Sequence, residues 1–394
     1  MKIHSFRFAA FVMTACLVAS MIFASPGKTA ELPPKPELIN VCGYEVGGGT
    51  YVQIAAVGDA ILRKFGIKMR FYPGPSTVAR ILASKIGRTH ASTLAIDPLY
   101  AIEGMYEYST FEWGPQRDMR IVYPVEQTFA WCLAAAGDSG IKTFADIRGK
   151  KVPSYVGSPG SNAIMEASLA AGGLTYKDVK VVEVYSLMAG YQALVDGKVD
   201  VADYGSSHEW AYKAASSRHG IYWIPTPPED KAMWATLRKK CPVLSPLLVT
   251  EGGGITKPTW LPTWPYPVWT AYEGVMSDNM AYWLVKGFVE CYDLYKDAVP
   301  QQMPGYKLER VLKLAPVYPW HNGAIKYFKE IGVWTDRLER NHKNALDRQA
   351  KLYKLWEAAL VEAEQKGVKS TDLPKFWQEK RKAALADEYY TPVD

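Results

Sequence analysis

Three short stretches rich in glycine and hydroxyl residues are the parts of this sequence best suited to hold a small molecule. They lie at 45–51, 74–77 and 157–162, and each joins a predicted strand to a predicted helix. The first and third combine several glycines with a threonine or serine at the start of the helix. Such loops expose backbone N–H groups, and a helix N-terminus favours negative charge. This chemistry predicts a small carboxylate or a similar anion as the ligand.

A single loop of this kind is more simply interpreted as an ordinary turn. One such loop in each half of the chain favours binding, because a cleft needs two walls. In open α/β sheets, ligands bind at the carboxyl ends of the strands, which is where these loops lie. The loops therefore predict one ligand cleft between two halves of the protein.

Residues that would mark an enzyme are few. The segment HEWAY at 208–212 resembles the HExxH motif of zinc proteases, but Tyr212 replaces the second metal-binding histidine. Asp200 and Asp203 could act as an acid–base pair, although alternation of polar residues along a strand and its exit loop explains them equally well. The sequence contains neither a G-x-S-x-G nor a G-x-x-x-x-G-K-[ST] motif. We therefore expect no catalytic residues, no metal and no cofactor.

The first 30 residues have the pattern of a secretory signal. Lys2 and Arg7 precede an apolar run at 8–24, and a proline-rich stretch follows at 32–36. The run is as long as the shortest membrane-spanning helices, so a retained N-terminal anchor is the alternative. We expect cleavage after Ala24 or Ala30 and a periplasmic mature protein.

The composition of the remaining chain is that of an ordinary globular protein, with 48% hydrophobic and 22% charged residues in the full sequence. Residues 1–30 hold three of the 46 basic residues and none of the 40 acidic ones, which leaves a balance near +3. That balance is too small to indicate a nucleic-acid partner. The signal leaves four cysteines (Cys42, Cys132, Cys241 and Cys291), whose three pairings the sequence does not distinguish.

Short β-like runs alternate with helical patterns from residue 38 onward. Strands are expected at 38–42, 68–72 and 91–96, and a second set of strand–helix units begins at 151. Repeats of this length imply parallel sheets with helices on their faces. The segment 225–270 is rich in proline and tryptophan and is expected to be irregular, and 268–275 looks like a strand that returns to the first lobe.

The C-terminal part predicts a long amphipathic helix at 335–365. Apolar and small residues recur there at spacings of three and four, from Leu338 through Trp356 to Ala363. Docking on the protein's own body is the simpler interpretation of this stripe. A homodimer through the same helix is the alternative.

Several motifs together resemble the TAXI family of TRAP-transporter solute receptors. They are GGTY at 48–51, PGPS at 73–76, DSGIKTFADIRGKKV at 138–152, GSPGS at 157–161, ALVDGKVD at 193–200 and APVYPWHNGA at 315–324. The resemblance covers about 38–340, and the chain departs from the family pattern in the longer segment 225–270 and in the tail beyond 340.

The resemblance implies a two-lobed α/β periplasmic binding protein of the type II-like kind. Its sheets would be parallel-rich, with hinge segments between the lobes and a ligand cleft between them. The implied division is a signal peptide at 1–30, lobe I at 31–135, lobe II at 136–225, a return segment at 226–334 that completes lobe I, and the C-terminal helix and tail at 335–394.

The resemblance also implies the ligand, the partner and the site. The ligand would be a small carboxylate, such as an amino acid or a dicarboxylate, delivered to TRAP membrane permease subunits. A periplasmic sensor for a signalling receptor and a periplasmic enzyme on the same fold are the alternatives. The expected ligand-binding residues are Gly49, Thr50, Tyr51, Ser76, Asp97, Ser158, Gly160, Ser161, Asn162 and Tyr204, of which Asp97 and Tyr204 are placed only by lying at strand ends.

Overall fold

The computed structural model describes residues 32–46 and 49–385. The predicted signal peptide and the predicted tail after residue 385 lie outside these residues. From Pro34 onward the chain forms one compact unit. None of the described helices combines the length and the apolar character that a membrane span requires. The four cysteines that the structure describes are buried free thiols.

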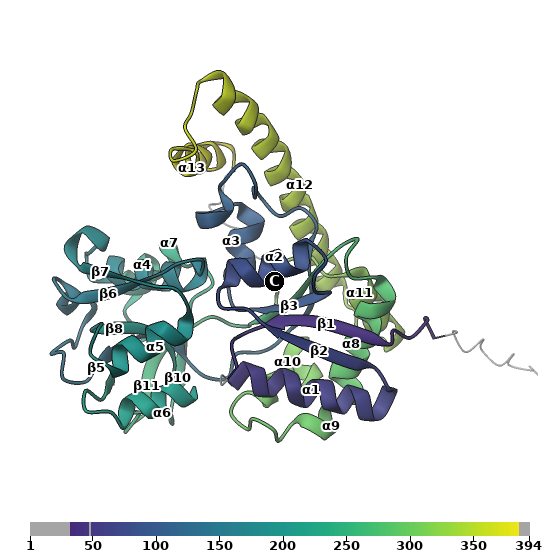
Figure 1. The fold of residues 1–394 in the computed structure, drawn as a ribbon, viewed down its shortest axis with the longest axis horizontal. Helices are drawn as coiled ribbons and strands as arrows, with labels where there is room; N and C mark the ends of the chain where they lie inside the picture. Colours follow the sequence, from purple (N-terminus) through teal and green to yellow (C-terminus); the bar gives the residue numbers. More distant parts are fainter. Residues whose placement is uncertain (1–31, 47–48, 386–394) are drawn as a thin grey trace, which may run out of the picture. The chain divides into compact units, whose positions relative to one another are not determined.

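The first lobe is built on a five-stranded sheet with the order β2-β1-β3-β12-β4 (Figure 1). Its strands are β1 (Leu38–Gly43), β2 (Lys68–Pro73), β3 (Ala91–Leu94), β4 (Met119–Pro124) and β12 (Val268–Tyr272). β1 pairs in parallel with β2 and β3, whereas β12 lies antiparallel between β3 and β4. The sheet is therefore mixed, and β12 is the strand that departs from the parallel arrangement of repeated strand–helix units. The chain leaves this sheet after β4 and returns beside it, so the returning strand runs in the opposite direction.

The second lobe contains three smaller groups of strands. An antiparallel sheet has the order β8-β5-β9, while β6 and β7 pair in parallel and β10 and β11 form an antiparallel hairpin. Their bounds are β5 (Trp131–Ala136), β6 (Lys151–Tyr155), β7 (Lys180–Val184), β8 (Val201–Gly205), β9 (Ile221–Trp223), β10 (Ser245–Val249) and β11 (Thr259–Thr263). Each lobe has its own cluster of buried apolar side chains. The two-lobed α/β fold that the sequence predicts is confirmed, and the residue boundaries given for the lobes stay predictions.

Helices cover the faces of these sheets. They are α1 (Gly49–Phe65), α2 (Thr77–Lys85), α3 (Asp97–Glu103), α4 (Pro159–Ala171), α5 (Leu187–Val195), α6 (Glu209–Ala215), α7 (Lys231–Lys240), α8 (Asp278–Glu290), α9 (Tyr292–Tyr295), α10 (Leu308–Val311), α11 (Asn322–Glu330), α12 (Asp336–Gln365) and α13 (Leu373–Ala384). Short 3-10 turns are η1 (Tyr106–Tyr108), η2 (Phe144–Ile147), η3 (Tyr176–Asp178) and η4 (Met303–Tyr306).

The segment 225–270 is more regular than its composition suggests. It contains α7, the β10–β11 hairpin and the start of β12, so the expectation of an irregular segment is wrong. The hairpin buries Val249 and Leu261 in the core of the second lobe. Antiparallel pairing satisfies the backbone groups of both strands, although Pro246 and Pro262 each remove one donor.

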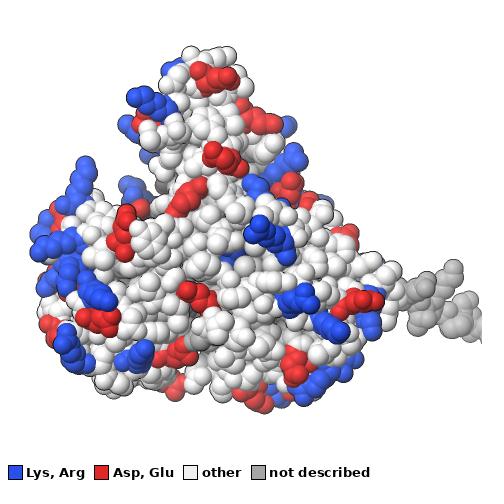
Figure 2. All heavy atoms as spheres, viewed as in Figure 1, with Lys and Arg blue, Asp and Glu red and all other residues white. Residues whose placement is uncertain are grey.

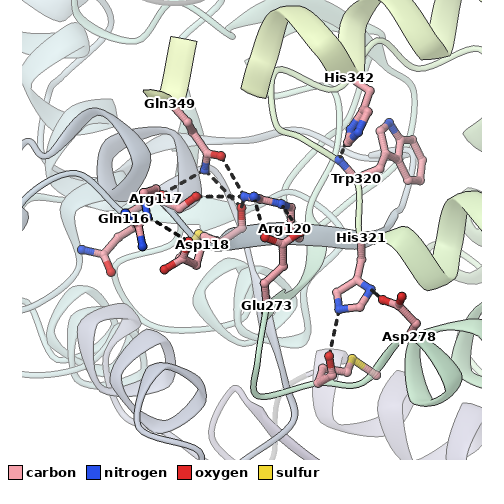
Figure 3. A network of polar contacts seen from close by, with 12 residues as sticks. Gln116, Arg117, Asp118, Arg120, Glu273, Asp278, Trp320, His321, His342 and Gln349 are labelled. Atoms are coloured by element: carbon pink, nitrogen blue, oxygen red, sulfur yellow. Dashed lines mark hydrogen bonds and ion pairs between the residues drawn. The ribbon is translucent and has the colours of Figure 1, made fainter. Parts of the chain in front are cut away.

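The long C-terminal helix α12 lies on the protein's own body. The face that the sequence predicts as apolar is buried, from Leu338 through Leu352 to Ala363. Polar contacts fix its position: Gln349 on α12 accepts a hydrogen bond from Arg120 Nη1 on β4 at 2.8 Å and donates to the carbonyl of Gln116 at 2.9 Å (Figure 3). The apolar stripe of α12 therefore packs against the protein's own body. A homodimer through this helix stays a prediction.

A buried acid anchors both C-terminal helices to α3. Glu103 is 1% exposed and accepts hydrogen bonds from Arg348 on α12 at 2.5 Å and from Arg381 on α13 at 2.8 Å. Trp377 of α13 also donates to the Glu103 carbonyl at 3.1 Å. A buried charge is stabilised in this way only while it keeps its partners, so the three side chains hold one position.

Candidate functional site

A small cavity lies where the carboxyl ends of β1 and β3 face the second lobe. Its volume of about 60 Å³ has room for on the order of four water molecules. Tyr44 follows β1, Ala95 follows β3, and Trp131 begins β5 on the opposite side. The remaining lining residues are Thr50, Gln53, Thr93, Leu94, Val125, Glu126, Gln127, Thr128, Phe129, His208, Trp264, Pro267, Val268, Trp269, Gln302 and Tyr306.

Aromatic rings form the apolar part of this cavity. Trp131 packs against Trp264 with ring centroids 5.4 Å apart, and against His208 at 5.8 Å. Rings of this size give a small solute a large contact area at low conformational cost. The cavity can therefore hold the apolar part of a small solute between the two lobes.

Amides and hydroxyl groups form the polar part. Gln53, Gln127 and Gln302 contribute amides, and three threonines contribute hydroxyl groups. Thr93 Oγ1 and Trp264 Nε1 are buried, and the part of the chain that the structure describes offers neither a hydrogen-bond partner. Buried polar atoms normally have a partner, so these two atoms are available to a solute or to water.

His208 belongs to this cavity rather than to a metal site. Its Nδ1 accepts a hydrogen bond from the backbone N–H of Trp210 at 3.3 Å and caps α6. Burial lowers the pKa of His208 to about 4. The neutral ring therefore carries its proton on Nε2 at neutral pH. Among residues 32–46 and 49–385, no group of three or more His, Cys, Asp or Glu side chains is placed to hold a metal ion.

The predicted loop at the start of α1 contributes one residue to the cavity. Thr50 lines it, and Gly49 lies next to the Gln302 amide, since a Cβ at Gly49 would approach Gln302 Nε2 to 3.0 Å. Tyr51 lies instead against Phe71, with ring centroids 4.9 Å apart in an edge-on arrangement. Gly47 and Gly48 of this loop lie outside the described residues.

Three more of the predicted ligand-binding residues use their side chains for hydrogen bonds within the protein. Ser76 caps α2 by accepting the Ala79 N–H at 3.3 Å, and both ends of the Asn162 amide bond the Tyr155 backbone at 2.8 Å. The Tyr204 hydroxyl donates to the Tyr191 carbonyl at 2.7 Å. Ser158 is buried, and among the described residues its hydroxyl has no hydrogen-bond partner. The structure therefore does not bring these four side chains together at the cavity, and their role in binding stays a prediction.

The loop 157–162, predicted to bind an anionic ligand, contacts carboxylates of the first lobe. Asp97 Oδ1 accepts the Gly160 N–H at 2.7 Å, and Glu107 Oε1 accepts the Gly157 N–H at 3.1 Å. A Cβ on Gly160 would lie 2.8 Å from Asp97 Oδ2, so only glycine allows this approach. The protein's own acids thus occupy the N–H groups that the sequence offered to a ligand.

Behind these contacts lies a second buried carboxyl group. Ser161 Oγ donates to Asp203 Oδ2 at 2.7 Å, and Asp203 is 1% exposed. Burial raises the pKa of Asp203 to about 7, against the opposing effect of the Ser161 hydrogen bond. Burial also raises the pKa of Asp97, opposed by the Gly160 N–H and the charge of Arg80.

Arg80 is a buried cation near this cluster that the sequence analysis did not single out. Its Nη1 donates to the Gly74 carbonyl and its Nη2 to Thr77 Oγ1, both at 2.9 Å. Its guanidinium also lies 3.9 Å from the centre of the Tyr44 ring. The sequence gave no signal for Arg80, because it lies on the side of the helix opposite the apolar residues Val78, Leu82 and Ile86. Trp131, Trp264 and Gln302 gave no signal either, because they lie far from the predicted loops in the sequence.

The two lobes, the sheets within them and the cavity at the strand ends define an α/β fold of the periplasmic-binding-protein kind. Within that class, the chain belongs to the NMT1-like family, whose model matches residues 80–332. A search of curated proteins finds no match.

Solved structures of transport proteins are similar to this chain at low sequence identity. A binding component of an ABC phosphonate transporter from Pseudomonas aeruginosa is 12% identical, with 84% of this chain and 100% of that chain covered and a TM-score of 0.46. The alkanesulfonate-binding protein SsuA from Xanthomonas axonopodis pv. citri, bound to MOPS, is 13% identical over 76% and 92%, with a TM-score of 0.43. The periplasmic aliphatic sulphonate binding protein SsuA from Escherichia coli is 14% identical over 79% and 99%, with a TM-score of 0.41.

Proposed function

We propose that this protein is an extracytoplasmic solute receptor that binds a small organic solute between its lobes and delivers it to a membrane transporter. The observation that carries the proposal is the cavity, since it combines residues from both lobes with aromatic surfaces and unpartnered polar atoms. Solute sites are typically concave and mainly apolar, with a few polar groups that orient the ligand. A site between two lobes also couples binding to hinge motion.

The finer parts of this proposal come from the sequence motifs. The TAXI-like motifs favour a TRAP permease as the partner, and the pattern of residues 1–30 favours export to the periplasm. The same motifs favour a carboxylate as the solute, and the N-terminus of α1 at Thr50 is the feature of the cavity that suits negative charge.

The hydrogen bond between the buried side chains of Ser161 and Asp203 favours a binding protein over an enzyme. Ser161 has the Asp203 carboxyl group, rather than a histidine, as its partner, and both side chains are buried. A hydroxyl nucleophile needs an adjacent base and access to the substrate. The pair therefore supports the packing of the lobes rather than a reaction.

Native mass spectrometry of the mature protein, purified from its host under mild conditions, tests the proposal. We expect a small molecule of defined mass to leave the protein on activation. Re-addition of that molecule should change tryptophan fluorescence, because Trp131 and Trp264 line the cavity. A Tyr51→Phe variant is the matched control, since Tyr51 lies against Phe71 rather than in the cavity. If no molecule is released and no broad solute library shifts the melting temperature, the receptor function is refuted.

A further inference from the structure

The charges around the cavity are not those of an anion site. Of the described residues that line it, none is a lysine or an arginine. Glu126 carries the one formal charge among them, and it is paired with Arg310. Arg80 does not line the cavity: its Nη atoms donate to Gly74 and Thr77, and its buried Nε has no hydrogen-bond partner among the described residues. On the face that Figure 2 shows, Lys and Arg side chains gather over β6 and β7, where Arg148 and Lys180 are exposed.

In the loop 157–162, two of the backbone N–H groups that could receive a carboxylate are also occupied. Asp97 and Glu107 accept the N–H groups of Gly160 and Gly157. A carboxylate in the cavity would therefore lose its hydration without gaining a cation or these amides. Burial of an unpaired charge is strongly unfavourable, so the cavity disfavours an acid.

A cation is disfavoured by the donors in the cavity. Trp264 Nε1–H is a donor only, and the described residues provide no acceptor for it. The N-terminus of α1 reaches the cavity at Thr50, and its partial positive charge favours an acceptor and disfavours an ammonium group. Trp264 Nε1 and Thr93 Oγ1, which have no partner among the described residues, therefore favour a solute with an uncharged oxygen or nitrogen acceptor.

These observations rest on the proposed receptor function, and they favour a solute class other than the carboxylate that the sequence motifs favour. We propose that the solute is an uncharged molecule, with an apolar body that packs on Trp131 and a carbonyl-type acceptor that Trp264 and Thr93 bind. Gln53 Nε2 already donates to Gln302 Oε1, so Gln53 Oε1 and Gln302 Nε2 are the amide atoms that can complete the recognition of its polar end. A carboxylate and an amine of the same shape would bind more weakly, because the described lining residues provide no Lys or Arg for the acid and the unpartnered Trp264 N–H is a donor only.

Isothermal titration calorimetry with solutes of matched shape tests this inference on the full mature protein. Suitable sets are acetate, acetamide and ethylamine, and benzoate, benzamide and benzylamine. We expect at least one amide to bind about tenfold or more tightly than its acid and its amine, which corresponds to about 1.4 kcal/mol. Tighter binding of an acid or an amine, or release of such a molecule in native mass spectrometry, overturns the inference and leaves the receptor function intact.

Two variants locate the effect in the cavity. Trp264→Phe keeps an aromatic ring and removes the N–H, so the preference for the amide should fall toward parity. Gln127→Lys places a cation at the lining and should shift the preference toward the acid. Unchanged selectivity in both variants contradicts the assignment of the site. If no matched solute binds and native mass spectrometry releases nothing, the receptor function itself fails and this inference fails with it.

Discussion

The buried carboxyl group of Asp203 should make the stability of this protein fall as pH rises. Asp203 is almost fully enclosed, and burial raises its pKa from its ordinary value of 3.8 to about 7. The folded state therefore keeps this proton at pH values where the unfolded chain has lost it. Replacement of Asp203 by asparagine keeps the shape and an acceptor for the Ser161 hydroxyl, but removes the titration.

The sign and the size of the effect follow from the two pKa values. Below about pH 3.8 both states are protonated, and the group contributes nothing to the pH dependence. Between 3.8 and about 7 the unfolded state ionises first, so the free energy of unfolding falls. At about 1.36 kcal/mol per pKa unit, the loss is on the order of 4 kcal/mol, and it is complete slightly above the folded-state pKa.

Urea unfolding of the wild type and Asp203→Asn at several pH values between about 4 and 8 measures this loss. We expect the variant to gain stability over the wild type by on the order of 4 kcal/mol across that range. His208, whose pKa is lowered to about 4, gives the opposite slope between about 4 and its ordinary 6.5. That contribution is common to both proteins and cancels in the difference.

An exposed carboxyl group on α1 serves as the matched control. Asp59→Asn makes the same chemical change where the side chain is 59% exposed and paired only with Arg63. It reports the effect of the substitution outside the core. Parallel curves for wild type and Asp203→Asn, with a difference that does not change with pH, would refute the assignment of a proton to Asp203 in the folded state.

Four further variants probe the contacts described above. Gly160→Ala brings a Cβ to 2.8 Å from the Asp97 carboxylate, so we expect a loss of about 1–3 kcal/mol in unfolding free energy, and wild-type stability would contradict this contact. Glu103→Gln removes the buried acid that accepts from Arg348 and from the buried Arg381, and denaturant unfolding should show a loss of about 3 kcal/mol or more; a change below about 0.5 kcal/mol would disprove the anchor. Thr50→Ala should weaken solute binding by about 1–3 kcal/mol in calorimetry. Ser161→Ala should instead lower folding stability, because the Ser161 hydroxyl bonds a buried carboxyl group. Weaker solute binding in Ser161→Ala, together with lower stability in Thr50→Ala, would contradict both assignments.

The sequence alone determined those elements whose signal is local. The stripe of α12 was predicted residue by residue, because a helix repeats every 3.6 residues and its buried face appears directly in the spacing. The cap of α2 at Ser76 is local in the same way, since it contacts the backbone three residues later, at the Ala79 N–H. The alternation of strands and helices was likewise sufficient for the α/β class, and the two lobes were implied by the family resemblance.

Where the connection between two strands is long, the sequence did not predict the direction of the second strand or its neighbours in the sheet. β12 enters the first sheet after an excursion through the second lobe and lies antiparallel between β3 and β4. The parallel pairing expected from repeated units fails there, because direction depends on the end of the sheet at which the chain returns.

The tertiary structure also decided what the predicted ligand loops do. The loop 157–162 has the chemistry expected of an anion site, but the anions that it contacts are Asp97 and Glu107 of the same chain. Of the ten predicted residues, the cavity is lined by Thr50 alone. Its other walls come from residues such as Trp131, Trp264 and Gln302, which are distant in the sequence. Periodicity and turn chemistry report on neighbours along the chain, whereas burial, pairing and shifted pKa values arise only when packing brings distant side chains together.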